Sequence, residues 1–161
     1  MSHIYTEEHN EFQIDLRSAK WSIGNLNEIF RAVGSILNDV DWVAETEDAM
    51  LFVEFKNWLK GHIIDDMEKF YQNIARKFYG TAYYLMALGK TKPVSYALVI
   101  ASPPSDNIIN KRAQASIMKR LPYKLQENPD VTMIMISQFK IYGIDDWNND
   151  YPQYPLTKIQ K

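Results

Sequence analysis

The sequence predicts a single domain of the α/β class, in which a mixed central β-sheet is flanked by helices on both faces. Two nearly continuous apolar runs, at residues 94–101 and 131–137, have the composition of strands buried on both faces. Helical segments precede and separate them, which gives the order helix, hairpin, helix, strand, helix, strand. Hydrophobic residues make up 46% of the 161 residues and charged residues 24%, as in a globular chain with one core. We expect residues 1–161 to form this domain around a core from about residue 20 to 144.

Two elements are expected before the hairpin, which begins at residue 41. Residues 11–17 alternate apolar and polar side chains, and they form either a short strand or an extended lead-in. From Ile23 or Asn25 to Leu37, apolar residues recur at the spacing of an amphipathic helix. That helix carries Glu28 on its polar side.

The hairpin has a register that can be counted from its turn. Its expected parts are strands at residues 41–46 and 49–57 and a two-residue Glu47-Asp48 turn. Counting outward from this turn places Val43 opposite Phe52 and Asp41 opposite Glu54. Because side chains alternate along a strand, Lys56 lies on the same face as Glu54.

After the hairpin, a long helix and a buried strand are expected. Asp65-Asp66 opens the helix, where acidic residues suit the helix dipole, and Gly89 closes it after about Leu88. Pro93 then leads into the apolar strand at 94–101.

The last quarter of the chain should hold a helix, a strand and a tail. Residues 107–125 carry the helix, which Pro122 must end or bend. Residues 131–137 form the second buried strand, and residues 139–144 extend it or form an edge. From residue 145 to 161 the tail is rich in turn formers and aromatic residues, so it should lie over the surface without regular structure.

Composition excludes several classes of function. The chain has no cysteine, which removes thiol catalysis and cysteine-zinc sites, and its three histidines lack ligand spacing. No apolar run approaches the ~20 residues of a membrane helix, and the polar, acidic amino terminus does not resemble a secretion signal, so we expect a cytoplasmic protein. The motifs of nucleotide-binding loops and serine hydrolases are also missing. The net charge of −2 means that any nucleic-acid binding needs a local basic patch.

The hairpin carries the one charge pattern that lacks a structural explanation. Two opposed carboxylates repel each other unless a positive group lies between them. Asp41 and Glu54, with Lys56 beside them, suit a divalent cation held by oxygen ligands and an ammonium group that assists the reaction of water. The alternative is a solvated strand face, but Met50 and Phe52 share the face of Glu54 and make it partly apolar.

An acidic residue on one strand and Glu-x-Lys on the next resemble the PD-(D/E)XK, or restriction-endonuclease-like, nuclease superfamily, over about residues 20–140. The resemblance implies a restriction-endonuclease-like fold in which Asp41 and Glu54 bind Mg²⁺ or Mn²⁺. It also implies that Lys56 is the catalytic ammonium and that the Phe55 carbonyl is a further ligand. Val40 stands where the family usually has proline.

The same resemblance suggests further site residues. Glu28 on the first helix is a candidate acidic catalytic residue. On the helix after Glu-x-Lys, Gln72 is a candidate catalytic residue, and Arg76 and Lys77 are candidate nucleic-acid contacts. Asp39 is a rival to Asp41 as the metal ligand, because a register slip or a bulge would exchange them.

The function that this resemblance implies is metal-dependent hydrolysis of phosphodiester bonds in nucleic acid, with DNA as the first expectation. Basic residues of the segment 111–124 would supply a phosphate track, unless they form only a solvated helix face: Lys111, Arg112, Lys119, Arg120 and Lys124. The alternative function is an inactive nuclease-like subunit that binds nucleic acid or protein in a phage, defence or DNA-processing system. A domain of this size would act as a homodimer or beside a targeting subunit, with the aromatic tail as an interface or as a cap on the sheet.

Overall fold

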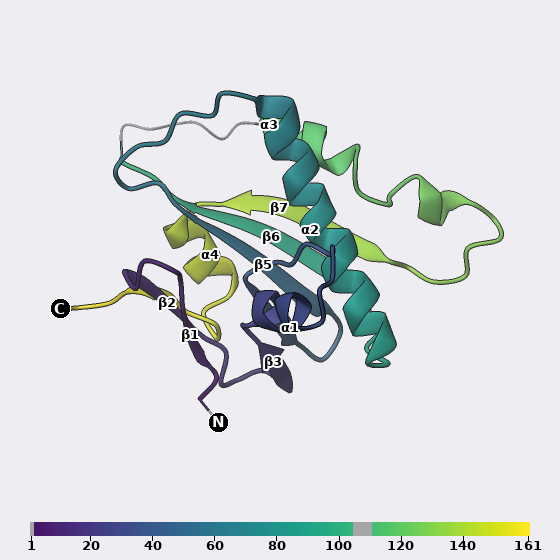
Figure 1. The fold of residues 1–161 in the computed structure, drawn as a ribbon, viewed down its shortest axis with the longest axis horizontal. Coiled ribbons are helices and arrows are strands. Elements are labelled where there is room, and N and C mark those ends of the chain that lie inside the picture. Colours follow the sequence, from purple (N-terminus) through teal and green to yellow (C-terminus); the bar gives the residue numbers. More distant parts are fainter. Residues whose placement is uncertain (1, 105–110) are drawn as a thin grey trace.

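A computed structural model describes residues 2–104 and 111–161. Its centre is a five-stranded sheet with the order β3-β4-β5-β6-β7 (Figure 1). The strands are β3 (Trp21–Ile23), β4 (Trp42–Glu45), β5 (Met50–Asn57), β6 (Val94–Ala101) and β7 (Ile136–Tyr142). Neighbours β3, β4 and β5 run antiparallel, whereas β5, β6 and β7 run parallel. The predicted α/β class and mixed sheet are therefore confirmed.

The β4–β5 hairpin has the predicted register. The Thr46 amide donates to the Ala49 carbonyl across the two-residue turn, and Val43 pairs with Phe52. The last pair of the ladder is Trp42 with Val53, so the next step along both strands brings Asp41 to Glu54. A hairpin register depends on contacts that are close in sequence, which is why it could be counted.

Three helices cover one face of the sheet (Figure 1): α1 (Leu26–Ala32), α2 (Met67–Ala87) and α3 (Lys111–Met118). The longest, α2, connects the parallel strands β5 and β6, and the Asp66 side chain caps it by accepting from the Lys69 amide at 3.0 Å. Its buried stripe includes Ile74 and Phe78, which pack on Phe52 of the sheet. All three helices lie where they are expected. Helix α1 is shorter than expected, and α3 ends at Met118 instead of near 125; its expected start at 107 falls outside the described residues.

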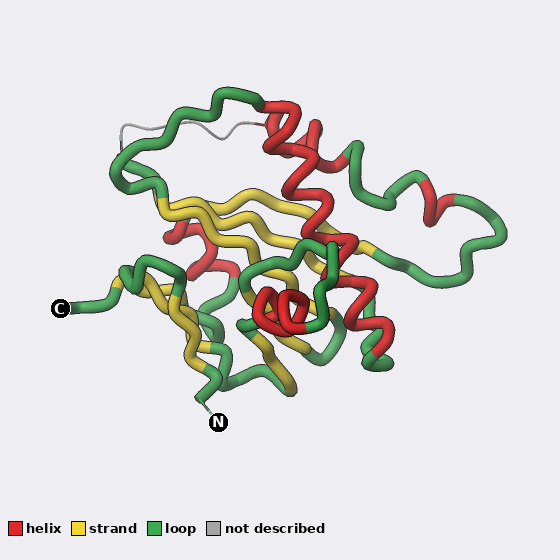
Figure 2. Tube along the Cα trace, viewed as in Figure 1, coloured by secondary structure: helices red, strands yellow, loops and turns green. Residues whose placement is uncertain are grey.

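The opposite face is covered by a second sheet and one helix. The small sheet has the order β1-β2-β8, from β1 (Ile4–Thr6), β2 (Phe12–Asp15) and β8 (Leu156–Lys158), and the helix is α4 (Ile144–Asp150). Figure 2 shows the two ends of the chain side by side in these strands. Buried side chains from both ends, among them Ile14, Trp147 and Leu156, form one apolar cluster with the sheet.

This second layer corrects two expectations. The tail after residue 145 is not irregular, because Trp147 and Leu156 are buried under the sheet and impose a helix and a strand. The core likewise begins well before residue 20, since β2 contributes Phe12 and Ile14. Both the order of the tail and the early start of the core depend on pairing between β2 and β8, which are far apart in sequence. Local patterns carry no information on such pairing.

The predicted strand at 131–137 is also wrong in its first part. Residues 131–135 lie outside the ladder, and Ile134 is exposed, because β6 begins at Val94 and pairs only from Ile136 onward. The Gln126 side chain takes the place of a neighbouring strand here. Its Oε1 accepts from the Met135 and Ile136 amides at 3.0 and 3.1 Å, and its Nε2 donates to the Ile136 carbonyl at 2.9 Å. The strand that follows is the edge strand β7.

Within the described residues, no helix is both long and apolar enough to cross a membrane.

Candidate functional site

A cavity of about 370 Å³ lies at the end of β5, where the large sheet meets the loop between β1 and β2. Its wall carries most of the charged groups predicted from the hairpin, joined by residues from the amino-terminal loop and from α2. The lining residues are Glu7, Glu8, His9, Asp41, Glu54, Phe55, Lys56, Asn57, Trp58, His62 and Lys77. The structure therefore brings Asp41, Glu54, Phe55, Lys56 and Lys77 together in one cavity.

Glu54 is the most deeply buried of these groups, with 1% of its side chain exposed. Its Oε1 lies 2.8 Å from the Lys56 ammonium and 3.0 Å from the Lys77 ammonium. Neither contact has the angles of a hydrogen bond, and Oε2 has no partner among the described residues. A buried carboxylate without directed hydrogen bonds is unfavourable unless another group satisfies it. Glu54 Oε2 is thus an open acceptor.

Asp41 lies beside Glu54, just before the first residue of β4. Its Oδ2 accepts a hydrogen bond of 2.8 Å from the Phe55 amide, which fixes the carboxylate where the β4–β5 ladder ends. Burial, together with repulsion from Glu54, raises the pKa of Asp41 to about 7. Two neighbouring acids that resist ionising together form a site that favours a positive charge.

Lys77 is the second cation of the site, and it comes from the middle of α2. Its ammonium contacts Glu54 and donates to the Asp39 carbonyl at 3.3 Å. Burial alone would lower the pKa of Lys77, but Glu54 and Asp41 outweigh that effect and raise the pKa overall. Its inward orientation could have been recognised in the sequence. Lys77 follows Phe70 and Ile74 at the i, i+4, i+7 spacing of the buried helix face.

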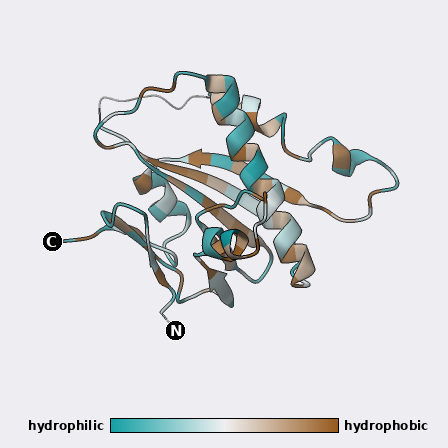
Figure 3. Cartoon of the chain, in the orientation of Figure 1, coloured by the Kyte–Doolittle hydropathy of each residue, from teal (hydrophilic) through white to brown (hydrophobic). Residues whose placement is uncertain are grey.

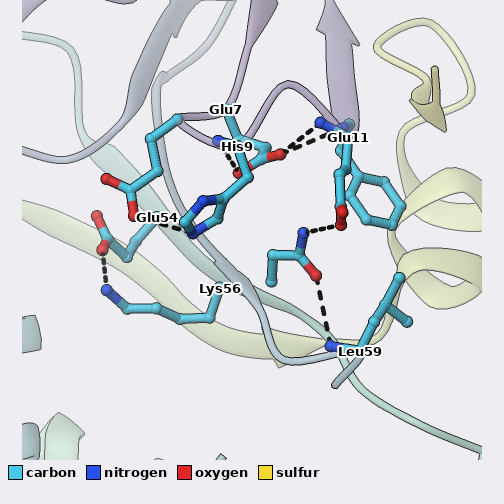
Figure 4. A network of polar contacts seen from close by, with 9 residues as sticks. Glu7, His9, Glu11, Glu54, Lys56 and Leu59 are labelled. Atoms are coloured by element: carbon cyan, nitrogen blue, oxygen red, sulfur yellow. Dashed lines mark hydrogen bonds and ion pairs between the residues drawn. The ribbon is translucent and has the colours of Figure 1, made fainter. Parts of the chain in front are cut away.

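The loop between β1 and β2 forms the opposite wall, which Figure 4 shows facing Glu54 and Lys56. The buried Glu7 carboxylate organises this loop by accepting from the His9 amide at 2.9 Å and the Glu11 amide at 2.7 Å. The His9 ring contacts the Glu8 carboxylate at 3.2 Å. No sequence pattern points to this loop, because its position follows from the small sheet.

The rim of the cavity is aromatic and is tied to the loop. His62 stacks on Trp58 with ring centroids 4.6 Å apart and an angle of 4° between the rings. Asn57, the last residue of β5, donates to Glu11 Oε2 at 2.7 Å. Two histidines that looked scattered in the sequence, His9 and His62, therefore line one cavity.

Other predicted site residues lie elsewhere. Glu28 is exposed on α1 and contacts Asn25 at 3.4 Å, and Gln72 is exposed on α2; neither lines the cavity. Asp39 is half-buried, and burial raises the pKa of its carboxyl group, yet only its backbone carbonyl reaches Lys77. Between the rival acids, Asp41 is the one that lines the cavity.

The basic residues predicted to contact phosphate fall into two groups, those that are exposed and one that makes structural contacts. Arg76 is exposed and lines a different cavity, whereas Lys111 and Arg112 are exposed on α3, and Lys119 is exposed just after it. Arg120 is engaged in structural contacts: it forms an ion pair with Glu68, and its Nη1 donates to the Ser116 carbonyl at 2.6 Å. It is therefore less suited to binding phosphate than its exposed neighbours.

A metal ion would find oxygen ligands here, although few of them. No group of three or more His, Cys, Asp or Glu side chains in the described parts of the chain is arranged to hold a metal. Asp41 and Glu54 supply two carboxylates. A strand residue directs its N–H and C=O to the same side, so the Phe55 carbonyl points to the side of β5 on which its N–H meets Asp41. Two carboxylates and a carbonyl fit Mg²⁺, which keeps several water ligands.

No protein-family model, curated protein or solved structure matches this chain. The geometry and charges of the Glu54 cavity are therefore the basis for assigning a function.

Proposed function

We propose that this protein is a metal-dependent phosphodiesterase that cleaves nucleic acid, with DNA as the preferred substrate, and that it has the restriction-endonuclease-like arrangement. The observation that carries the proposal is the buried Glu54 carboxylate, which has one unpartnered oxygen and lies beside Asp41 and two lysines in an open cavity. A structural ion pair would leave no such acceptor. A divalent cation would satisfy it.

In this proposal each side chain has a distinct role. Asp41 and Glu54 hold Mg²⁺ or Mn²⁺ with the Phe55 carbonyl, and the bound ion neutralises phosphate charge and lowers the pKa of water. The Lys56 ammonium, which is partly exposed, donates hydrogen bonds to the attacking water or to a phosphate oxygen. Lys77, which is about as buried as Lys56, contacts Glu54 from the α2 side and orients its carboxylate.

Binding of nucleic acid would require positive charge near the cavity. Lys56 and Lys77 supply positive charge inside the cavity. On and after α3, exposed basic residues add positive charge to the helical face of the sheet: Lys111, Arg112 and Lys119. The exposed His62 ring, stacked on Trp58, adds a flat surface suited to a nucleobase. A homodimer or a targeting subunit would provide the remaining contacts.

The test is cleavage of labelled single- and double-stranded DNA and RNA with Mg²⁺ or Mn²⁺ and with chelator. We expect cleavage that needs the metal and that falls by at least about 100-fold in Glu54→Gln and in Lys56→Met. Glu47→Gln is the matched control, because it makes the same change at the exposed turn of the same hairpin. Cleavage unchanged in Glu54→Gln and Lys56→Met would refute this assignment.

A second candidate is an inactive nuclease-like subunit that binds nucleic acid or protein. The observation that favours it is that two lysines already contact Glu54 and compensate its charge without a metal. This candidate predicts DNA binding that is independent of metal and no cleavage. Calorimetric titration with Mn²⁺ separates the two, because only the enzyme should bind the ion and lose that binding in Asp41→Ala.

A further inference from the structure

A second cavity, of about 500 Å³, lies between the C-terminal half of α2 and the loop that precedes β7. Buried strand residues Met50, Phe52 and Val94 form its deep part, and Leu85 closes it from the α2 side. In Figure 3 the brown of hydrophobic residues marks the central strands and also parts of the C-terminal half of α2. The volume falls within the range of about 300–1,000 Å³ that is typical of small-molecule sites.

The walls of this cavity are held in place by specific contacts. Residues 36–38 form one wall and lie against α2 at Gly80, where any side chain would overlap the Asn38 carbonyl. The Val40 amide continues this attachment by donating to Thr81 Oγ1 at 3.0 Å. On the other wall, Met135 is held by the hydrogen bond from its amide to Gln126. The cavity is therefore preformed.

Large apolar side chains line the cavity and yet remain exposed to water. They come from both walls and from α2: Ile36, Tyr79, Tyr83, Met86, Met133 and Ile134. Ile36 is 96% exposed, so its side chain gains almost none of the free energy of burying apolar surface. Exposed apolar residues gathered around a hollow indicate a binding site for an apolar group.

The charged residues that line the cavity indicate which polar group a ligand should carry. The described lining residues include Arg76, Lys90 and Lys92 but no acidic residue. Lys90 and Lys92 share the Glu45 carboxylate at 2.6 and 3.1 Å. Arg76 has no hydrogen-bond or ion-pair partner among the described residues. A guanidinium without a partner beside an apolar cavity suits a carboxylate, which it can bind through two parallel hydrogen bonds.

We propose that this cavity binds a fatty acid, with its hydrocarbon chain against the buried strand residues and its carboxylate on Arg76. A single unpartnered cation at the edge of a deep apolar cavity matches a ligand with one charged end. The site is separate from the Glu54 cavity, so the proposal does not depend on nuclease activity.

Calorimetric titration of the whole chain with decanoate tests the proposal, with decanol as the uncharged probe. We expect saturable binding of one decanoate per chain, weakened about tenfold or more in Arg76→Gln, while decanol binds both proteins equally. Arg112→Gln, the same change at an exposed arginine outside the cavity, should leave decanoate affinity unchanged. Ala82→Trp should fill the cavity and abolish binding of both probes in a protein whose circular dichroism is unchanged.

Two results would overturn the proposal. One is decanoate binding that is absent or is equal in Arg76→Gln and the wild type. The other is a concentration-dependent dimer in sedimentation velocity that Ala82→Trp disrupts and decanoate does not, since the face would then be an interface between copies. Because Arg76 is exposed, Arg76→Gln should fold normally and keep the test decisive.

Discussion

Replacing Asp41 by asparagine should make the metal-free protein more stable at about pH 8 and remove part of its pH dependence. The side chain is partly buried beside Glu54, and its pKa is raised from 3.8 to about 7, chiefly by burial. In the unfolded chain the carboxyl group loses its proton near pH 4, whereas in the folded protein it keeps the proton up to about pH 7. Asp41 therefore lowers the free energy of unfolding as pH rises between these values.

The size of the effect follows from the same two pKa values. The difference between 3.8 and about 7 corresponds to about 4 kcal/mol above pH 7, with a slope of about 1.4 kcal/mol per pH unit within the window. The side chain keeps some exposure in the cavity, so water screens part of this penalty, and we expect about 2 kcal/mol. Asparagine retains the hydrogen bond from the Phe55 amide, because its amide oxygen can accept it.

Urea denaturation at several pH values between about 3.5 and 8.5, with chelator present, measures this directly. The difference in stability between the variant and the wild type should be smallest near pH 4, grow as pH rises to about 7, and stay constant above that. Asp15→Asn is the matched control: hydrogen bonds from Arg17 lower the pKa of Asp15, so its loss should slightly destabilise the protein at neutral pH. Parallel curves for wild type and Asp41→Asn would show that the pKa of Asp41 is not raised by folding and would rule out this explanation.

Three further substitutions test other parts of the structure. Gly80→Ala should destabilise the protein by roughly 3 kcal/mol or more, measured by urea denaturation, because its Cβ would overlap the Asn38 carbonyl. Trp147→Phe should cost about 1–3 kcal/mol in thermal unfolding, since it leaves the buried Tyr154 carbonyl without the 2.8 Å hydrogen bond from the indole. Glu54→Gln should bind less Mn²⁺ in calorimetry, and its stability should fall at neutral pH because two lysine ammoniums lose their buried counter-ion.

The elements that the sequence predicts well are those whose contacts are local. The hairpin register followed from a two-residue turn and alternating side chains, and α2 followed from its helical spacing and the acidic residues at its start. The placement of Asp41 and Glu54 in one cavity is a direct result of that register. This half of the candidate site could therefore be predicted from the sequence.

The other half depends on pairing between distant segments. Glu7 and His9 reach the cavity only because β2 pairs with β8 near the other end of the chain, and neither strand shows a pattern that identifies its partner. Lys77 was predicted as a nucleic-acid contact, but not as a partner of Glu54. It lies on the buried face of α2, and a lysine at such a position requires a buried acid as its partner, which Glu54 provides.

The hydrogen bonds of Gln126 occupy the outer edge of the large sheet at the start of β7. Its side-chain amide offers the edge of β7 one acceptor and one donor, as a peptide group of an adjacent strand would. Further along β7, Gln114 supplies one more acceptor: its Oε1 accepts from the Ile141 amide at 3.2 Å. A strand from another molecule would have to displace these amides before it could pair with β7. The β7 edge of the sheet is thus protected against pairing with a strand of another molecule.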